Sequence, residues 1–352
     1  MPIIEAHDLR KTYQARDHAV HALAGLSLEV PEGTVTGLLG PNGAGKTTAV
    51  KVLTTLIRPD SGTAKVAGLD VLTQAREVKR VIGSSGQYAA VDENLTGLEN
   101  LEMVGRLYHL GTQEARSRAR ELIELFDLSE AGNRPVKGFS GGMRRRIDLA
   151  GALVINPKVL FLDEPTTGLD PRSRIALWAV IKSLVAGGTT VLLTTQYLEE
   201  ADHLADSISV IDQGRVIAQG TADELKAQIG GHRIALALVD AADTAVARDI
   251  LARHGAGPVT VDDSGRSLEV PVQRGPSTLA TALAELGQAG VELHDAGIRR
   301  PTLDDVFLTL TGHPAEAVGD PDTRDASATS GTSSSSGASI ASGTSDMDGA
   351  AS

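Results

Sequence analysis

Gly40-Pro41-Asn42-Gly43-Ala44-Gly45-Lys46-Thr47 follows an apolar run, Val35–Leu39, and precedes a helical pattern that begins at Lys46. This stretch fits the spacing GxxxxGK[ST], and it lies between a strand and a helix, as that motif requires. Its glycines let backbone N–H groups approach phosphate oxygens, while the start of the helix adds a favourable partial positive charge. A chance glycine turn would not also explain the flanking strand and helix. The stretch therefore predicts an α/β fold with a phosphate-binding loop.

Two side chains of this loop carry the predicted chemistry. The Lys46 ammonium is expected to bridge the β- and γ-phosphates and to take part in catalysis, and the Thr47 hydroxyl to bind Mg²⁺. The loop residues expected to bind nucleotide are Gly40, Pro41, Asn42, Gly43, Ala44, Gly45, Lys46, Thr47 and Thr48. The loop thus predicts a site for ATP and Mg²⁺.

A second chemical feature is an apolar run, residues 159–162, that is followed by Asp163 and Glu164. Ligands collect at the carboxyl ends of strands in open α/β sheets, so both carboxylates should lie beside the phosphate loop. Asp163 is then expected to hold Mg²⁺, and Glu164 to polarise the attacking water. A strand that ends in Asp-Glu is, by itself, more often a junction with solvated charges. Together with the phosphate loop, it predicts nucleotide hydrolysis.

Strand-like and helical patterns alternate over the first two thirds of the chain, which is typical of a parallel or mixed α/β sheet. Residues 95–128 are predicted to form consecutive helices inserted in this core, with Leu122, Leu125 and Phe126 on one apolar face. The other predicted strands are 191–195 and 208–211, and the predicted helices are 46–56, 171–185 and 197–205.

The pattern changes at Gly230-Gly231, to short strands at 234–238 and 268–272 and amphipathic helices at 244–254 and 278–286. Three domains are therefore predicted: a nucleotide-binding domain at 4–230 with a helical subdomain at 95–155, a small C-terminal α/β domain at 231–312, and a tail at 313–352. The tail is rich in Ser, Gly, Ala and Asp and offers little apolar area to offset ordering entropy. We expect it to be disordered.

Composition excludes several classes of protein. The net charge of −12 over 352 residues argues against general nucleic-acid binding, which usually needs a basic face. The absence of cysteine excludes disulfides, thiolate metal sites and cysteine nucleophiles. The apolar stretches fall far short of the ~20 residues that cross a bilayer, and the N-terminus lacks a signal-peptide pattern. A cytoplasmic product is expected.

The segment Phe139-Ser140-Gly141-Gly142-Met143 resembles the signature sequence of ABC ATPases, usually Leu-Ser-Gly-Gly-Gln, and stands at the expected distance before the acidic strand. Ser140 is a good N-cap, and the two glycines expose backbone donors at the start of a helix, where phosphate binds. A simple cap before an arginine-rich surface helix (residues 144–146) would explain the segment if it stood alone. The resemblance covers residues 4–230 and implies a P-loop NTPase core of ABC type with a helical subdomain.

The resemblance implies roles for further positions. Tyr13 lies where an aromatic ring stacks on adenine, Gln87 where a glutamine contacts Mg²⁺ and reports to the membrane partner, and Asp170 in the loop that crosses a dimer interface. In this family the signature of one subunit closes over ATP held by the other. Ser140 and Gly142 are therefore expected to bind the ATP of a second copy, which implies a homodimer.

One position departs from the family's pattern. Family members usually place a histidine near the γ-phosphate after the strand at 191–195, but this chain has Gln196. A glutamine amide can donate a hydrogen bond but carries no charge, so the exchange is expected to cost on the order of 1–2 kcal/mol. This corresponds to roughly a five- to thirty-fold loss of rate. We expect slow but real hydrolysis that depends mainly on Glu164.

Two segments point to a cargo. Residues 194–202, TTQYLEEAD, and 303–308, LDDVFL, resemble the daunorubicin-resistance-type exporter ATPases, with the resemblance extending to Gly312. It implies a peripheral subunit on the cytoplasmic face of the cell membrane, which docks near Gln87 and the helical insert on a separate integral membrane permease. The implied function is self-resistance through export of hydrophobic, anthracycline-like drugs.

Other functions stay open at this point. Related subunits export lipids, glycans or peptides, and the permease normally selects the cargo. A soluble ABC ATPase of DNA repair or translation is disfavoured by the single phosphate loop and the lack of sustained heptads. A nucleotide-gated binding subunit without turnover is expected if Gln196 abolishes hydrolysis. The C-terminal domain is expected to be either a clamp on the dimer or a sensor.

Overall fold

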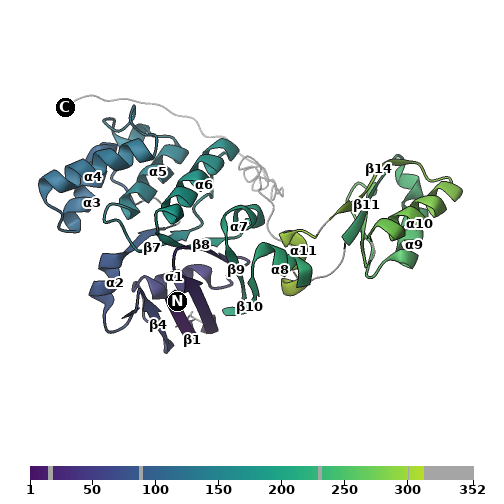
Figure 1. The fold of residues 1–352 in the computed structure, drawn as a ribbon, viewed down its shortest axis with the longest axis horizontal. Helices are drawn as coiled ribbons and strands as arrows, with labels where there is room; N and C mark the ends of the chain where they lie inside the picture. The colour runs from purple at the N-terminus through teal and green to yellow at the C-terminus, as the bar shows by residue number, and fades with distance from the viewer. Residues whose placement is uncertain (15–18, 87–89, 229–231, 274, 300, 313–352) are drawn as a thin grey trace, which may run out of the picture. The chain divides into compact units, whose positions relative to one another are not determined.

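The computed structural model describes residues 1–14, 19–86, 90–228, 232–273, 275–299 and 301–312, and it confirms the predicted α/β class (Figure 1). Its largest sheet has six strands in the order β10-β9-β3-β8-β7-β6. These strands are β3 (Val35–Leu39), β6 (Ile82–Ser85), β7 (Val159–Asp163), β8 (Thr190–Thr195), β9 (Ser207–Asp212) and β10 (Arg215–Gly220). Only the β9–β10 pair is antiparallel among these neighbours, so the sheet is mixed.

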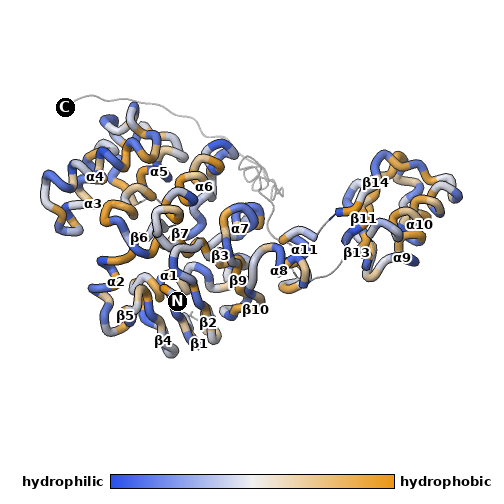
Figure 2. The backbone as a smooth tube through the Cα atoms, in the orientation of Figure 1, coloured by the Kyte–Doolittle hydropathy of each residue, from blue (hydrophilic) through white to orange (hydrophobic). Residues whose placement is uncertain are grey.

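The central strands β3, β7 and β8 are buried along their whole length, as expected for parallel strands that are covered on both faces. Side chains alternate between the two faces. Leu160 and Leu162 join one apolar cluster, and Val159 and Phe161 join the other. Figure 2, which colours the chain by residue hydropathy, shows the hydrophobic residues of β3, β7 and β9. The sequence predicted these strands because burial on both faces leaves continuous apolar runs.

A second sheet, which sequence patterns did not predict, packs on the cluster of Val159 and Phe161. It is antiparallel, in the order β2-β1-β4-β5. Its strands are β1 (Pro2–Gln14), β2 (Ala19–Pro31), β4 (Ser61–Val66) and β5 (Leu69–Asp70), and the short helix α2 (Ala75–Val81) follows them. This sheet brings Tyr13 and the start of β2 to the phosphate loop, whose residues share a cavity with them.

The helix after the phosphate loop, α1 (Lys46–Leu53), is three residues shorter than the predicted 46–56. Thr54 caps it, and the Thr54 hydroxyl donates back to the carbonyl oxygen of Val50 at 2.8 Å. Thr55 then has a positive φ of 62°, which no α-helix continues. Apolar periodicity could not reveal this left-handed residue, because it depends on the turn into β4.

The helical insert is formed by α3 (Gly97–Leu107), α4 (Thr112–Leu125) and α5 (Gly141–Ala152). On α4 the buried side is Ala115, Ala119, Leu122 and Ile123, and Phe126 follows it into the same cluster. The prediction for Leu125 was wrong, since its side chain is 44% exposed. At 3.6 residues per turn, position 125 lies about 120° around the helix from position 119. The apolar stripe therefore passes to one side of it.

Helices α6 (Pro171–Ala186) and α7 (Leu198–Leu204) match their predicted positions to within a residue at each end, and Pro171 occupies the first turn of α6. Proline is suited to that turn because its missing N–H would have had no intrahelical partner. After β9 and β10 the chain forms α8 (Ala222–Gln228).

The segment from β11 (His232–Leu238) to β14 (Leu293–Arg299) has the element order βαββαβ, with sheet order β12-β13-β11-β14. This is the split βαβ arrangement of ferredoxin-like domains. The remaining elements are α9 (Thr244–His254), β12 (Thr260–Val261), β13 (Ser267–Val272) and α10 (Gly275–Gln288). Both helices pack with alternate residues of β11 and β13 into a separate apolar cluster.

The final helix, α11 (Leu303–Thr311), contacts α7 and α8. Leu303, Val306 and Phe307 join an apolar cluster with Leu198 of α7 and Leu225 of α8. Although α11 follows the ferredoxin-like segment along the chain, it is therefore part of the core beside β9.

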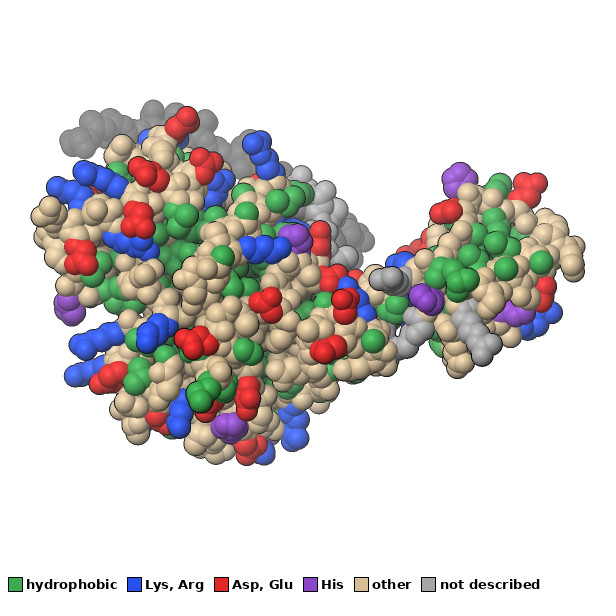
Figure 3. Space-filling model, in the orientation of Figure 1, with side chains coloured by type: hydrophobic (Ala, Val, Ile, Leu, Met, Phe, Trp, Pro, Cys, Tyr) green, Lys and Arg blue, Asp and Glu red, His purple; other side chains and the backbone are tan. Residues whose placement is uncertain are grey.

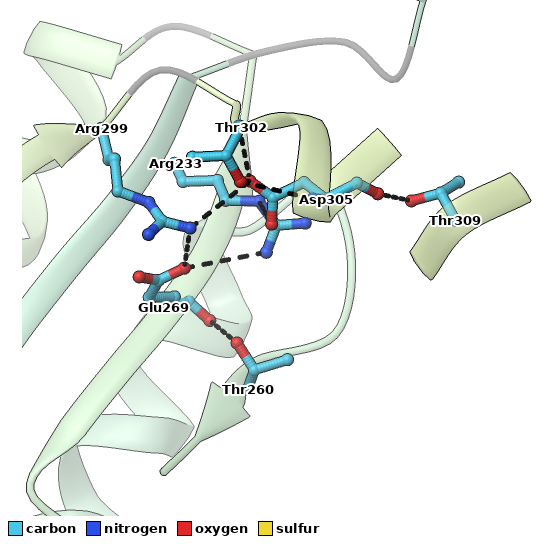
Figure 4. A network of polar contacts seen from close by, with 7 residues as sticks. All are labelled: Arg233, Thr260, Glu269, Arg299, Thr302, Asp305 and Thr309. Carbon is cyan, nitrogen blue, oxygen red and sulfur yellow. Dashed lines mark hydrogen bonds and ion pairs between the residues drawn. The ribbon is translucent and has the colours of Figure 1, made fainter. Parts of the chain in front are cut away.

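A polar network joins α11 to the ferredoxin-like sheet (Figure 4). Asp305 accepts hydrogen bonds from the N–H and hydroxyl of Thr302, which completes a capping box at the start of α11. The same carboxylate lies 3.3 Å from Nε of Arg233 and 3.4 Å from Nη2 of Arg299. Glu269 lies 3.2 Å from Nη2 of Arg299, so two guanidinium groups face two carboxylates.

Several predictions are not tested by this fold. Gly230, Gly231 and the predicted disordered tail at 313–352 lie outside the described residues, and the predicted domain boundaries stay predictions. No helix within the described ranges is long and apolar enough to span a bilayer.

On the face drawn in Figure 3, acidic and basic side chains are interspersed over the coloured surface.

Candidate nucleotide-binding site

The phosphate loop connects β3 to α1 through a backbone that only glycine adopts easily. Gly43 and Gly45 have φ values of 82° and 106°. A Cβ at Gly45 would lie 2.3 Å from the carbonyl oxygen of Ala22, so any side chain there would displace β2. The glycines therefore set both the turn and the close approach of β2 to the loop.

Lys46 points its ammonium back into the loop and is 5% exposed. Its Nζ donates to the carbonyl oxygens of Gly40 at 2.7 Å and Pro41 at 3.1 Å, and it lies 4.0 Å from Oε1 of Glu164. A buried cation at the loop is well suited to attract the charge of a polyphosphate.

Asp163 and Thr47 meet at the same edge of the sheet. The Thr47 hydroxyl donates to Oδ1 of Asp163 at 3.2 Å, and the Thr194 hydroxyl donates to the same oxygen. A hydroxyl and a carboxylate are hard oxygen ligands of the kind that Mg²⁺ binds beside nucleotide phosphates. This pair therefore fits the ion that the sequence predicts.

Glu164 follows β7 with a φ of 50°, in the left-handed region that is unusual for residues other than glycine. Its N–H donates to the carbonyl oxygen of Thr194 at 3.1 Å, and its side chain is 10% exposed. The hydroxyl of Thr167 lies 3.4 Å from Oε2 of Glu164. The carboxylate is thus held at the mouth of the loop.

A cavity of about 330 Å³ lies over the phosphate loop. Glu164, Lys46, Thr47, Thr48 and Tyr13, which are predicted to act on the nucleotide, line it together with most of the glycine-rich turn. Val20 and Ala22 of β2 also line it, and no sequence motif indicates them. The Tyr13 side chain is 40% exposed, so its ring is accessible to a planar ligand.

The predicted dimer-facing residues do not line this cavity. Ser140 is the N-cap of α5, and its hydroxyl accepts from the N–H of Met143 at 3.3 Å. Asp170 is the N-cap of α6 and accepts from the N–H and hydroxyl of Ser173, which lowers the pKa of Asp170. Gly142 faces Ser173, since a Cβ at Gly142 would lie 3.0 Å from the Ser173 hydroxyl. The two caps therefore adjoin.

Gln196 follows β8, is half-buried, and does not line the cavity. Its Oε1 is buried and has no hydrogen-bond partner among the described residues. Gln87 lies outside the described residues. The predicted roles of both residues stay predictions.

Sequence reasoning missed two residues that contact the acidic strand end. Thr194 binds both Asp163 and the N–H of Glu164 through its hydroxyl. Its place in a Thr-Thr pair before Gln196 was the one available signal. Arg145 is 7% exposed, contrary to the alternative that placed it on a surface helix. Its neighbours in sequence are both arginines, so composition indicated a solvated run.

A mixed α/β sheet with a phosphate loop, an adjacent acidic strand end and a helical insert defines a P-loop nucleotide hydrolase. Comparison with known proteins narrows this class. Residues 23–167 match the family model described as ABC transporter, and residues 220–311 match the C-terminal domain of DrrA1-3-like ATP-binding proteins.

Individual relatives agree with these matches. The daunorubicin resistance ATP-binding protein DrrA2 of Streptomyces coeruleorubidus is 55% identical over 313 residues, covering 89% of this chain and 96% of that protein. DrrA3 of the same organism is 58% identical over 83% of this chain and 91% of that protein. A solved dimeric ATP-binding cassette in a post-hydrolysis state with ADP and Pi superimposes with a TM-score of 0.58 at 25% identity, covering 62% of this chain and 98% of that chain.

The chain belongs to the daunorubicin-resistance-type ATP-binding proteins of the ABC transporter family, and it is a nucleotide-binding ATPase. The family resemblance inferred from the phosphate loop, the signature and the LDDVFL segment is thereby confirmed.

Proposed function

We propose that this ATPase energises the export of hydrophobic, anthracycline-like drugs and so confers self-resistance. The observation that carries the proposal is the extent of the similarity. Identity of 55% to a daunorubicin resistance protein covers 89% of the chain, and a separate match extends through the C-terminal segment to residue 311. Similarity confined to the ATPase core would have supported only the general class.

Each step of hydrolysis is assigned to a named side chain, and of these Lys46, Thr47 and Glu164 line the cavity. Lys46 would hold the β- and γ-phosphates, and Glu164 would polarise the attacking water. Thr47 and Asp163 would hold Mg²⁺, with Gln87 completing the ion's surroundings. Bound Mg²⁺ supplies charge neutralisation between the phosphates. Gln196 would donate an uncharged hydrogen bond to the γ-phosphate, which predicts slow turnover.

The active species would be a head-to-tail homodimer. Ser140 and Gly142 lie outside the cavity of their own chain, which supports a role at the ATP of a second copy. The adjoining N-caps of α5 and α6 would place Asp170 at the same interface. The dimeric state of the similar solved cassette supports this arrangement.

The membrane partner would dock in a groove of about 300 Å³ beside the helical insert. Leu101 and Val104 of α3 line it, as does Tyr108, the residue after that helix. Lys79 and Asp148 add charged groups to the lining. A short amphipathic helix of a separate permease would fill such a groove. This chain would then be a peripheral subunit on the cytoplasmic face of the membrane.

The test is ATP turnover by the purified chain, alone and reconstituted with the permease encoded beside its gene, with and without daunorubicin. Wild-type protein should hydrolyse ATP in all conditions, and the drug should stimulate turnover only with the permease. Glu164→Gln should lower turnover by at least about a hundredfold, because the water-activating carboxylate is lost. Glu32→Gln, which removes an exposed carboxylate of the same type, should not change it.

The outcomes separate the parts of the proposal. Stimulation of ATP turnover by a lipid or glycan but not by daunorubicin would contradict the proposed drug cargo. It would still agree with an exporter ATPase. Turnover unaffected by Glu164→Gln would contradict the role of Glu164. ATP-driven dimerisation without any phosphate release would indicate a nucleotide-gated binding subunit.

A further inference from the structure

Arg145 is a buried guanidinium that donates to backbone carbonyls around the acidic strand end and to one further carbonyl. Its Nε donates to the carbonyl oxygen of Pro165 at 2.8 Å. Its Nη2 donates to the carbonyl oxygens of Asp163 and Glu164, each at 3.2 Å, and its Nη1 donates to that of Gly86. One side chain of α5 therefore holds the last residue of β7, the two residues that follow it, and the residue after β6.

These bonds act on the part of the backbone that is strained. A left-handed φ at a residue other than glycine persists only when surrounding contacts fix it. At Glu164 the contacts are the bonds from Arg145 to the carbonyls on either side and the bonds between the Glu164 N–H and Thr194. The backbone around Glu164 is therefore held in part by Arg145, although the guanidinium does not line the nucleotide cavity.

Asp148 lies one turn further along α5 and continues the connection. Its Oδ2 accepts from the Ser85 hydroxyl at 2.6 Å and lies 3.8 Å from Nη1 of Arg145, and its Oδ1 accepts from the N–H of Ala90 at 2.8 Å. Burial raises the pKa of Asp148 and lowers that of Arg145, so both groups lie in a medium of low polarity. Asp148 and Arg145 together bind residues on both sides of the segment that contains Gln87.

The contacts that begin at the Glu164 backbone and pass through Arg145 and Asp148 end in the groove proposed for the permease. Asp148 and Ala90 line the groove, as does Gly151 on the next turn of α5. A ligand that moves Ala90 or α5 would change the hydrogen bonds of Asp148, because its donors, the Ser85 hydroxyl and the Ala90 N–H, belong to segments outside α5. From Asp148 the contact continues through Arg145 to the backbone of Glu164.

We propose that Arg145 is a positioning residue for Glu164, and that Arg145 and Asp148 form the link through which occupation of the groove controls hydrolysis. Arg145 would touch neither ATP nor water and would act only through the Glu164 backbone. The second part of this proposal rests on the proposed docking of a permease, whereas the first part needs only the ATPase.

The first arm measures basal turnover of the full chain carrying Arg145→Gln or Arg145→Lys. Arg145→Gln should lower kcat about tenfold or more while KM for ATP stays within about twofold, because the phosphate loop is untouched. Arg145→Lys keeps the charge but has a single donor group, so it should recover part of the loss. The control is Arg118→Lys, which alters a similar bond from a guanidinium to the carbonyl of Leu153 at the far end of α5, and which should leave both constants unchanged.

A double-mutant cycle separates positioning from general destabilisation. In the Glu164→Gln background, Arg145→Gln should have no further effect on single-turnover hydrolysis, because its target is already absent. Additive losses would contradict action through Glu164. Equal losses of ATP affinity and kcat, or a folded Arg145→Gln protein with wild-type kcat, would also overturn the proposal. Arg145→Lys provides the same test if the Gln variant fails to fold.

The second arm measures the ratio of permease-stimulated to basal turnover. Asp148→Asn should lower this ratio at least threefold, since the amide cannot accept from both Ser85 and Ala90 and still face Arg145. An unchanged ratio in a variant that still binds the permease would overturn the link. If wild-type protein does not respond to the permease, the proposed function fails instead, while the basal arm still decides the role of Arg145.

Discussion

Gln196 is the residue at which this chain departs from the histidine of its family, and its surroundings give the departure a measurable consequence. The amide carries no charge, and its Oε1 is buried without a hydrogen-bond partner among the described residues. We predict that Gln196→His raises kcat by roughly five- to thirty-fold, because a charge-assisted hydrogen bond to phosphate is stronger than a neutral one. Steady-state ATP turnover measures this directly.

The pH dependence of kcat in the Gln196→His variant separates the effect of the ring's charge from the effect of its shape. The gain from the histidine should be largest below its ordinary pKa of about 6.5, where the ring is cationic, and should shrink as pH rises. Gln196→Met keeps the length of the side chain and removes its polar atoms, so it should be slower than wild type at every pH. A histidine variant no faster than wild type at about pH 6 would mean that the residue does not reach the γ-phosphate.

At the scale of elements, sequence patterns succeeded where burial on both faces leaves an unbroken apolar run. β3 has the predicted bounds, and β7 and β8 extend one residue beyond them. β1 and β2 were missed because their pairing contains register shifts, which destroy the alternation of apolar and polar residues. β14 was missed because much of it is exposed.

The same distinction applies to the site. The phosphate loop and Asp163–Glu164 are recognisable because their chemistry is local in sequence, and the cavity brings Lys46 and Glu164 together as predicted. The bonds of Arg145 to Gly86 and Glu164 span 59 and 19 residues. No local pattern specifies such contacts, so a buried arginine inside a run of three arginines cannot be told from its more exposed neighbours by sequence.

Helix α11 provides an element-scale prediction. Phe307 is 3% exposed in the cluster shared with α7 and α8, while Leu308, the next residue, is 44% exposed. We predict that Phe307→Ala lowers the free energy of unfolding by about 3–5 kcal/mol through lost burial and a residual cavity. Leu308→Ala should lower it by less than about 1 kcal/mol. Urea unfolding of the full chain measures both, and similar losses would contradict the packing of α11 on the core.

For the whole molecule, the packing of α11 changes what a truncation can establish. A chain that ends at Gly230 loses the ferredoxin-like segment together with Leu303, Val306 and Phe307, which cover Leu198 and Leu225. Exposing an apolar side chain of this size costs about 1.5–3 kcal/mol. We therefore predict that truncation after Gly230 lowers the thermal midpoint of the ATPase core, whereas truncation after Gly312 does not. Differential scanning calorimetry measures both transitions.

The thermal midpoint of the chain ending at Gly230 decides how a loss of dimerisation in that chain is interpreted. Full-length Phe307→Ala is the reference, because it weakens the packing of α11 but keeps the C-terminal segment. If that segment is a clamp, the chain ending at Gly230 should dimerise less with ATP than this variant does. The comparison is made at a temperature at which both ATPase cores are equally folded. Equal dimerisation by the two proteins, measured by light scattering with ATP in the Glu164→Gln background, would assign the effect to α11 alone. If the ATPase core has the same thermal midpoint with and without α11, the predicted stabilisation by α11 is wrong. The apolar cluster would then contribute nothing that the ATPase core needs to fold.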